Sequence, residues 1–174
     1  LKYVRQIQRA FSTISDVASI EEINNEGSQV KIIDLNVFSE DITEFTRKRV
    51  EPITKIMFVG CLDKVCVKVN EEILEDAVTA IINNAIDFGY RLNISVSRCG
   101  DNGLIDIYND GELIPEDHMN TIFQYGTSYR SSDSNEHFGI GLFSADKRIR
   151  ALGGEISILN RDNGVSFLVS LPLA

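Results

Sequence analysis

Asn84 is a candidate ligand for a cation such as Mg²⁺. It lies in the run AIINNAIDFG, residues 80–89, toward the end of a long amphipathic pattern. An amide oxygen suits Mg²⁺, which prefers oxygen ligands and keeps several waters while it bridges phosphate groups. Taken alone, the run also fits a second interpretation, in which Asn83 and Asn84 are ordinary polar residues at a helix end.

A second segment places polar side chains and a glycine directly after a predicted strand. The run IYNDGELIP, residues 107–115, passes from apolar residues to Asn109, Asp110 and Gly111, and Pro115 then opens a helix. A side chain at a strand end reaches a flat ligand, and a glycine lets the backbone come close to it. Taken alone, this segment is better explained as a turn.

A third segment, HFGIGLFSADKRIRALGG at residues 137–154, places Gly139 and Gly141 before a helix that starts near Leu142. Such a start leaves backbone N–H groups free to meet phosphate oxygens, assisted by the helix dipole. One glycine pair is weak evidence, because many loops contain one. Between the second and third segments, the polar run TSYRSSDSNE carries a single cation, Arg130, and is predicted to form a lid. The alternative is a solvated loop without a role.

The elements that must position these segments follow an α+β order. Residues 1–23 show an apolar repeat of three to four positions, typical of an amphipathic helix, and the main domain begins after Gly27. The pattern then predicts a strand from Val30, a polar helix, a hairpin and a long central helix with Gly89 past its end. In order, these last three elements are Ser39–Arg49, Ile56–Val59 with Lys64–Val69, and Glu71–Phe88.

Two further hairpins complete the predicted sheet. The first joins Asn93–Arg98 to Leu104–Tyr108, with positive backbone angles expected at Asn102 and Gly103. The second joins Glu155–Leu159 to Val165–Leu171. A short helix near Glu116 and a helix over 140–151 lie between the hairpins. This order predicts an α+β two-layer sandwich, with helices on one face of a mixed, mostly antiparallel sheet.

Composition narrows the class of protein. The chain has 174 residues, 43% of them apolar and 25% charged, which is enough for one well-packed domain. A formal net charge of −9 argues against nucleic acid as a partner. No run approaches the roughly 18 apolar residues of a membrane span, so we expect a cytoplasmic domain, including the cytoplasmic part of a membrane-bound sensor. Three cysteines without zinc-ligand spacing predict neither a disulfide framework nor a metal cluster.

Taken in order, the segments resemble the GHKL ATPase superfamily and, within it, the catalytic domain of histidine kinases. The likeness covers residues 30–174. IINNAIDFG resembles the N box, NDGELIP the G1 box, IFQYGTSY the F box that forms the lid, and GIGLFSA the G2 box. The ending LGGEISILNRDNGVSFLVSLPLA resembles the family's last strands. The resemblance implies bound ATP and Mg²⁺, and it implies these contact residues: Asn84 for the metal, Asn109 and Gly111 for adenine, Gly139, Gly141 and Leu142 for the phosphates, and Arg130 from the lid.

The resemblance also implies a role in two-component signalling. Residues 1–27 are similar to the end of a dimerisation and phosphoacceptor region, and residues 28–174 to the catalytic domain. Both histidines, His118 and His137, fall in the catalytic part. The chain would therefore transfer the γ-phosphate of ATP to a histidine outside this fragment, without a nucleophile of its own. Implied partners are the phosphoacceptor domain of the same protein, homodimeric at full length, and a response regulator.

Several positions depart from the family pattern. Asn109 stands where the family has an adenine-binding aspartate, and an amide accepts a weaker, uncharged hydrogen bond. Leu113 replaces the second glycine of the G1 box, and Asp87 replaces a common basic residue. These changes favour an alternative, a degenerate domain that acts as a dimerisation or response-regulator docking module. A third option, ATP hydrolysis, is disfavoured because Ala80 replaces the glutamate that activates water in the gyrase and chaperone branches.

Overall fold

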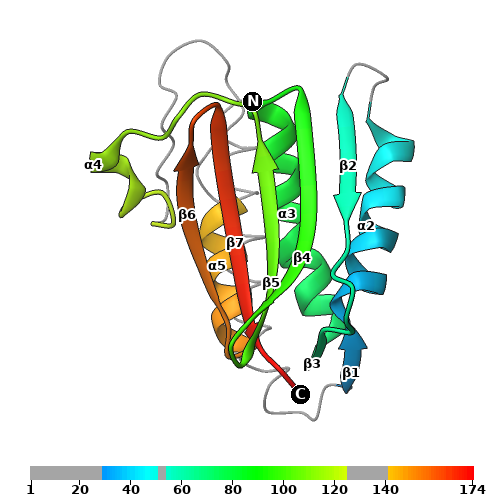
Figure 1. The fold of residues 1–174 in the computed structure, drawn as a ribbon. Coiled ribbons are helices and arrows are strands. Elements are labelled where there is room, and N and C mark those ends of the chain that lie inside the picture. The colour runs from blue at the N-terminus through cyan, green and yellow to red at the C-terminus, as the bar shows by residue number, and fades with distance from the viewer. Residues whose placement is uncertain (1–28, 51–53, 125–140) are drawn as a thin grey trace, which may run out of the picture.

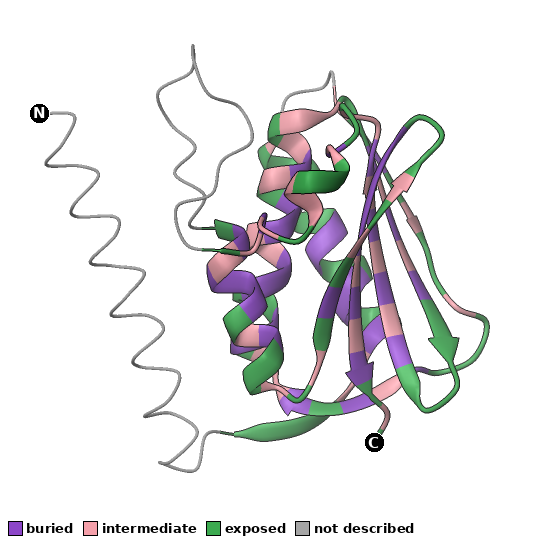
Figure 2. Ribbon diagram, turned by 90° about the vertical axis from the view of Figure 1, so that its left-hand side faces the viewer, coloured by how far each residue is buried: buried purple, intermediate pink, exposed green. Residues whose placement is uncertain are grey.

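A computed structural model describes residues 29–50, 54–124 and 141–174, which form two layers. One layer is a five-stranded sheet in the order β2-β4-β5-β7-β6, in which only the β2–β4 pair is parallel. The helices cover one face of this sheet (Figures 1 and 2). The predicted α+β two-layer sandwich is therefore confirmed. The sheet strands are β2 (Lys55–Val59), β4 (Arg91–Cys99), β5 (Asn102–Asn109), β6 (Glu155–Arg161) and β7 (Gly164–Pro172).

The remaining elements are the helices and a small second sheet. The helices are α2 (Leu35–Arg49), α3 (Glu71–Phe88), the short α4 (Glu116–Met119) and α5 (Gly141–Ala151). The second sheet pairs β1 (Val30–Asp34) with β3 (Cys66–Asn70) in antiparallel register. The predicted helices near Glu116 and over 140–151 are thus present as α4 and α5. No helix in the described part of the chain is both long and apolar enough to cross a membrane.

The core fills the space between the sheet and the helices. Alternate residues of β5 face the helices, and Ile105 and Ile107 among them are fully buried. Opposite them, α3 presents a continuous apolar stripe, which includes Leu74, Ala77 and Ile81 with no exposed surface. Each buried Leu or Ile side chain stabilises the fold by roughly 1.5–3 kcal/mol relative to an exposed one. Burial of this stripe fixes α3 as the central helix of the domain.

The predicted bounds of the central helix are confirmed, because both of its ends carry local signals. Asn70 is the N-cap, and its side-chain oxygen accepts a hydrogen bond from the Ile73 N–H at 3.2 Å. Glu71 and Glu72 place negative charge in the first turn, where the helix dipole favours it. Gly89 follows the last helical residue.

Replacing Asn70 by alanine is expected to lower the free energy of unfolding by about 1 kcal/mol, because the Ile73 N–H loses its capping acceptor. Urea denaturation of the whole chain measures the change. Asn83→Ala is the matched control, since it removes the same amide from an exposed position inside the same helix. Alanine favours the helix there, so the control is expected to be at least as stable as the wild type. Equal stability of Asn70→Ala and the wild type would contradict the capping role.

The predicted hairpin between Ile56–Val59 and Lys64–Val69 is wrong. β2 pairs with β4, whereas β3 pairs with β1, so the two strands belong to different sheets. The first turn of α2 redirects the connection between them. The Asn36 side chain accepts from the Cys61 N–H at 2.7 Å and donates to the Asp63 carbonyl at 3.0 Å. These two bonds hold residues 61–63 against α2 and keep β3 from folding back onto β2.

The β4–β5 hairpin forms as predicted, but its turn lies two residues earlier. Gly100 carries the positive φ, 58°, while Asn102 and Gly103 pair with Cys99 and Arg98 in the ladder. A Cβ atom at Gly103 would lie 2.6 Å from a methyl carbon of Val65. Gly103 is therefore required by close packing and not by its backbone angle. The β6–β7 hairpin turns at residues 162 and 163, as the sequence predicts.

Candidate functional site

Asn109 ends the row of β5 side chains that face the helices. Its exposed fraction is only 3%, so its amide is withdrawn from bulk solvent. An amide side chain at the end of a strand offers a hydrogen-bond acceptor and donors in one plane. Asn109 is thus suited to bind the polar edge of a flat molecule.

Two glycines place Asn109 beside the C-terminal end of α3. A Cβ atom at Gly111 would lie 2.3 Å from the Phe88 carbonyl oxygen, and one at Gly89 would lie 3.1 Å from the Asn109 amide nitrogen. Asn84, which is partly exposed, precedes Phe88 by four residues, about 6 Å along the helix axis. Asn109 and Asn84, the predicted adenine and metal residues, therefore both lie near the C-terminal end of α3.

The start of α5 lies beside the same end of α3. The two helices pack together and run antiparallel (Figure 1), and the Arg148 guanidinium of α5 lies 3.7 Å from the Asp76 carboxylate of α3. Gly141 precedes Arg148 by seven residues, about 10 Å of helix, and the same rise along α3 leads from Asp76 to Asn83. Gly141 is thus level with Asn83 and Asn84. The start of the third predicted segment's helix therefore lies at the same end of α3 as the first two segments.

At the start of α5 the backbone is accessible, while the apolar side chains that follow hold the helix in the core. A Cβ atom added at Gly141 would meet no atom of the described residues within 4 Å, whereas the side chains of Leu142, Ala145 and Ile149 are buried in the core. The Leu142 side chain therefore packs in the core, and only the backbone of Leu142 is available to a ligand. The first N–H groups of a helix have no intrahelical partner, so they are donors for an anion.

A charged pair on α5 lies toward the opposite end of the helix. The Arg150 guanidinium donates to the nearly buried Asp146 carboxylate at 2.9 Å. This hydrogen bond and the negative charge of Asp146 raise the pKa of Arg150 above its ordinary value, so Arg150 stays charged at all physiological pH values. Arg150 itself places a positive charge in the last turn of α5, where the helix dipole favours it.

The remaining predicted residues have different outcomes. Arg130, Gly139 and the predicted lid lie outside the described residues, as does the N-terminal helix predicted over residues 1–27. Leu113 is 48% exposed, so about half of this residue lies at the surface and it is not one of the buried residues. Asp87 is exposed on α3. Ala80 packs against the core, which agrees with a structural role at that position.

The metal prediction is compatible with the donor set. Among the described residues, no three His, Cys, Asp or Glu side chains cluster as a cage for an ion. Mg²⁺ does not need such a cage, because it binds through one or two protein oxygens while water and substrate phosphates supply the rest. The partly exposed amide of Asn84 beside the open start of α5 fits this mode of binding.

Two residues that hold the site were not predicted. The Asp110 carboxylate accepts from the Tyr90 and Arg91 N–H groups at 2.7 and 2.8 Å, so it fixes the chain after β5 to the start of β4. The side chain of Asn160, on β6, binds both backbone groups of Ile114. An aspartate directly after a strand is a signal for local backbone capping. No local signal points from Asn160 to Ile114.

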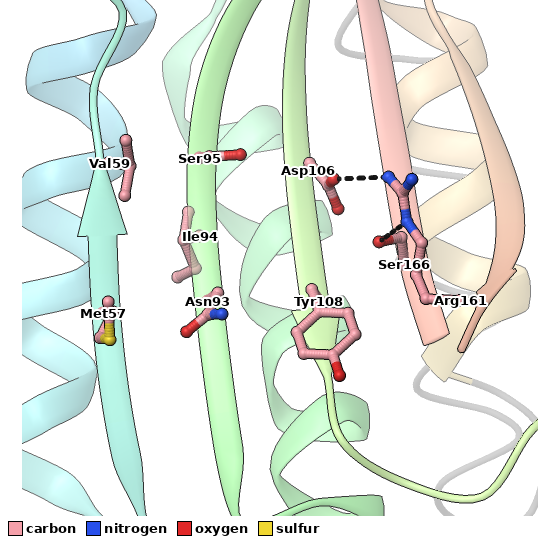
Figure 3. A pocket seen from close by; sticks show the side chains of 9 residues that line it. All are labelled: Met57, Val59, Asn93, Ile94, Ser95, Asp106, Tyr108, Arg161 and Ser166. Carbon is pink, nitrogen blue, oxygen red and sulfur yellow. Dashed lines mark hydrogen bonds and ion pairs between the residues drawn. The ribbon is translucent and has the colours of Figure 1, made fainter. Parts of the chain in front are cut away.

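A pocket of about 500 Å³ lies on the other face of the sheet (Figure 3). Its lining includes Asp106 and Tyr108 of β5, which alternate with the helix-facing Ile107 and Asn109. Arg161 also lines this pocket, and its guanidinium donates a hydrogen bond to the Asp106 carboxylate at 3.1 Å. The sheet separates this pocket from Asn84, Asn109 and Gly141, so the pocket is no part of their site.

The amino-acid sequence matches the family model of the histidine kinase-, DNA gyrase B- and HSP90-like ATPases over residues 69–174. The chain belongs to this ATPase family. The matched range contains the three segments that converge at the end of α3, and the resemblance to GHKL histidine kinase domains is thereby confirmed. Membership of the family makes the chain an ATP-binding domain.

Curated relatives of this ATPase domain are sensor kinases. The heme sensor protein HssS of Staphylococcus haemolyticus is 28% identical over 159 residues, 88% of this chain and 34% of that protein. The sensor histidine kinase GtrS of Pseudomonas aeruginosa is 29% identical over 100 residues, 58% of this chain and 20% of that protein. The chain thus spans about a third or less of these two relatives.

Solved structures of histidine kinases share the fold of this ATPase domain. The catalytic domain of the histidine kinase ThkA has a TM-score of 0.72 at 20% identity and covers 83% of this chain and 96% of that one. The histidine kinase AdeS of Acinetobacter baumannii has a TM-score of 0.71 at 19% identity and covers 98% of this chain and 80% of that one. The two-layer arrangement is therefore that of histidine kinase catalytic domains.

Proposed function

We propose that this chain is the ATP-binding catalytic domain of a sensor histidine kinase, and that it binds ATP with Mg²⁺ at the end of α3. In this proposal Asn84 binds the metal, Asn109 and Gly111 contact adenine, and the start of α5 at Gly141 receives the phosphates. Gly139 and the Leu142 backbone extend the phosphate contact, and Arg130 reaches it from the lid. The convergence of Asn84, Asn109 and Gly141 is the observation that carries the proposal.

The proposed reaction is transfer of the γ-phosphoryl group to a histidine of the phosphoacceptor domain in the same protein. Mg²⁺ supplies charge neutralisation at the phosphates. The chain itself orients ATP and needs no nucleophile, because phosphoryl transfer depends mainly on positioning and electrostatics. The proposal includes a homodimer at full length, a response regulator as the next phosphate acceptor and a location on the cytoplasmic side.

The departures from the family pattern do not favour the non-catalytic alternative. The amide oxygen of Asn109 accepts a hydrogen bond from the adenine amino group, although a carboxylate would accept a stronger one. Leu113 is about half exposed, and Asp87 is exposed one turn beyond Asn83. ATP hydrolysis by activated water remains disfavoured, because Ala80 offers no carboxylate. Phosphate release by the isolated chain is therefore expected to be negligible.

Calorimetric titration of the whole chain with ATP and Mg²⁺ tests the binding step. Saturable binding that weakens when EDTA removes the metal supports the proposal, and no binding at millimolar nucleotide would refute it. The transfer step requires the full-length protein and radiolabelled ATP. If the chain is a kinase domain, an acid-labile phosphohistidine is expected. If it is only a docking module, none is expected.

Replacing Gly141 by alanine is expected to separate stability from nucleotide binding. The added methyl group meets no atom in the part of the chain that the structure describes, and alanine favours the helix over glycine by about 1 kcal/mol, so the melting temperature should not fall. The same methyl group occupies the space at the start of α5 where the phosphates are proposed to bind. ATP affinity should fall about tenfold, as measured by calorimetry. Unchanged ATP affinity would exclude close contact between Gly141 and the nucleotide.

A further inference from the structure

Asn160 joins two segments that lie 46 residues apart. Its side-chain nitrogen donates to the Ile114 carbonyl at 2.7 Å, and its side-chain oxygen accepts from the Ile114 N–H at 3.0 Å. An amide side chain has the same donor and acceptor as a peptide group, so this pair imitates one step of a β-ladder. Asn160 therefore fastens Ile114 to β6.

Asn160 also lies in line with Asn109. In the sheet register Asn109 pairs with Val165, and Val165 pairs with Asn160, so the three residues form one row across β5, β7 and β6. Residues of one row face the same side of a sheet, and two strand spacings correspond to about 10 Å. Asn160 thus projects from the helix-facing side of the sheet on which Asn109 lies.

The segment 110–114 between these two positions is held at both ends. At its start the Asp110 carboxylate is fixed to the N–H groups of Tyr90 and Arg91, and at its end Ile114, 7% exposed, is fixed to Asn160. The chain runs from β5 past the ends of β7 and β6 toward α4 (Figure 1). The segment includes Gly111, one of the two proposed adenine contacts.

We propose that Asn160 is a positioning residue for the adenine pocket, because it sets the path of residues 110–114 beside Asn109. The inference rests on the proposed function and adds to it a residue outside the three predicted segments. Asn160 touches no nucleotide. It acts through Ile114, so its loss affects recognition of the base and leaves the phosphate contacts at α5 unchanged.

Asn160→Asp tests the role in the whole chain with one nearly isosteric change. The carboxylate still accepts from the Ile114 N–H, but it cannot donate to the Ile114 carbonyl, and the two oxygens repel each other. The readout is the ratio of the dissociation constant of Mg²⁺-tripolyphosphate to that of Mg²⁺-ATP, which isolates the contribution of the nucleoside. We expect the ratio to fall about tenfold, because displaced supporting groups lose much of their benefit. Asn163→Asp, exposed in the adjacent turn, is the matched control and should keep the wild-type ratio.

The outcomes distinguish this inference from the proposed function. If the wild type binds ATP and Asn160→Asp keeps the wild-type ratio, the positioning role is wrong and the ATP site stands. If the wild type binds no nucleotide at millimolar concentration, both fail. Should circular dichroism show that Asn160→Asp is unfolded, Asn160→Ser replaces it, because the shorter serine side chain lacks the separate donor and acceptor atoms that reach the two Ile114 groups. An unchanged ratio in Asn160→Ser would equally overturn the role.

Discussion

Asn84→Ala is expected to weaken Mg²⁺-ATP binding by about 100-fold, which corresponds to about 2.7 kcal/mol. The amide oxygen of Asn84 is the proposed protein ligand of the metal, and a methyl group cannot replace it. Stability should not decrease, because Asn84 is partly exposed on α3 and alanine has the higher helix propensity. Calorimetry with ATP and Mg²⁺ measures the binding, and a thermal melt measures the stability.

The diagnostic result is the response of this variant to removal of the metal. EDTA should weaken ATP binding to the wild type strongly, but it should change the affinity of Asn84→Ala little, because the variant has already lost the metal contact. Asn83→Ala, which changes the exposed neighbour, should bind and respond like the wild type. Wild-type affinity in Asn84→Ala, or an undiminished response to EDTA, would exclude Asn84 as the metal ligand.

Local signals explain why α3 was predicted to the residue. Its apolar repeat, the cap at Asn70 and the glycine at 89 all lie within the helix or next to it. The β2–β3 connection was predicted wrongly because its path depends on Asn36, whose amide meets residues 61 and 63 only after α2 has formed. A strand's partner is a non-local property, and alternation alone does not specify it.

In the site, too, residues in short recognisable segments were predicted, whereas a residue that acts through a long-range contact was not. Asn84, Asn109 and Gly141 were predicted because each belongs to a short segment with a recognisable residue order, and the order of the segments identified the family. Asn160 was missed because its partner lies 46 residues away and is a backbone group, which leaves no trace in the identity of residue 114. Residues proposed to bind ATP are thus easier to recognise in this sequence than the residue proposed to position a binding segment.

Gly111→Ala is expected to lower both stability and nucleotide affinity. Its Cβ atom would lie 2.3 Å from the Phe88 carbonyl oxygen and 2.6 Å from the Asn109 amide nitrogen. The first neighbour is backbone at the end of α3, so it cannot move without shifting the helix end. Overpacking of this kind costs about 1–3 kcal/mol. Urea denaturation should show this loss of stability, and calorimetry should show ATP affinity reduced at least tenfold, because Asn109 must move.

Comparison with Gly141→Ala makes the result specific, since the same methyl group is added at both positions. No atom of residues 29–50, 54–124 or 141–174 would crowd a Cβ atom at Gly141, whereas Gly111 is crowded, so only Gly111→Ala should lose stability, while both variants should lose affinity. Affinity should fall in Gly111→Ala even at temperatures where the variant is fully folded, because the displaced groups belong to the adenine pocket. If the folded variant bound ATP as the wild type does, adenine would have to bind away from Gly111 and Asn109.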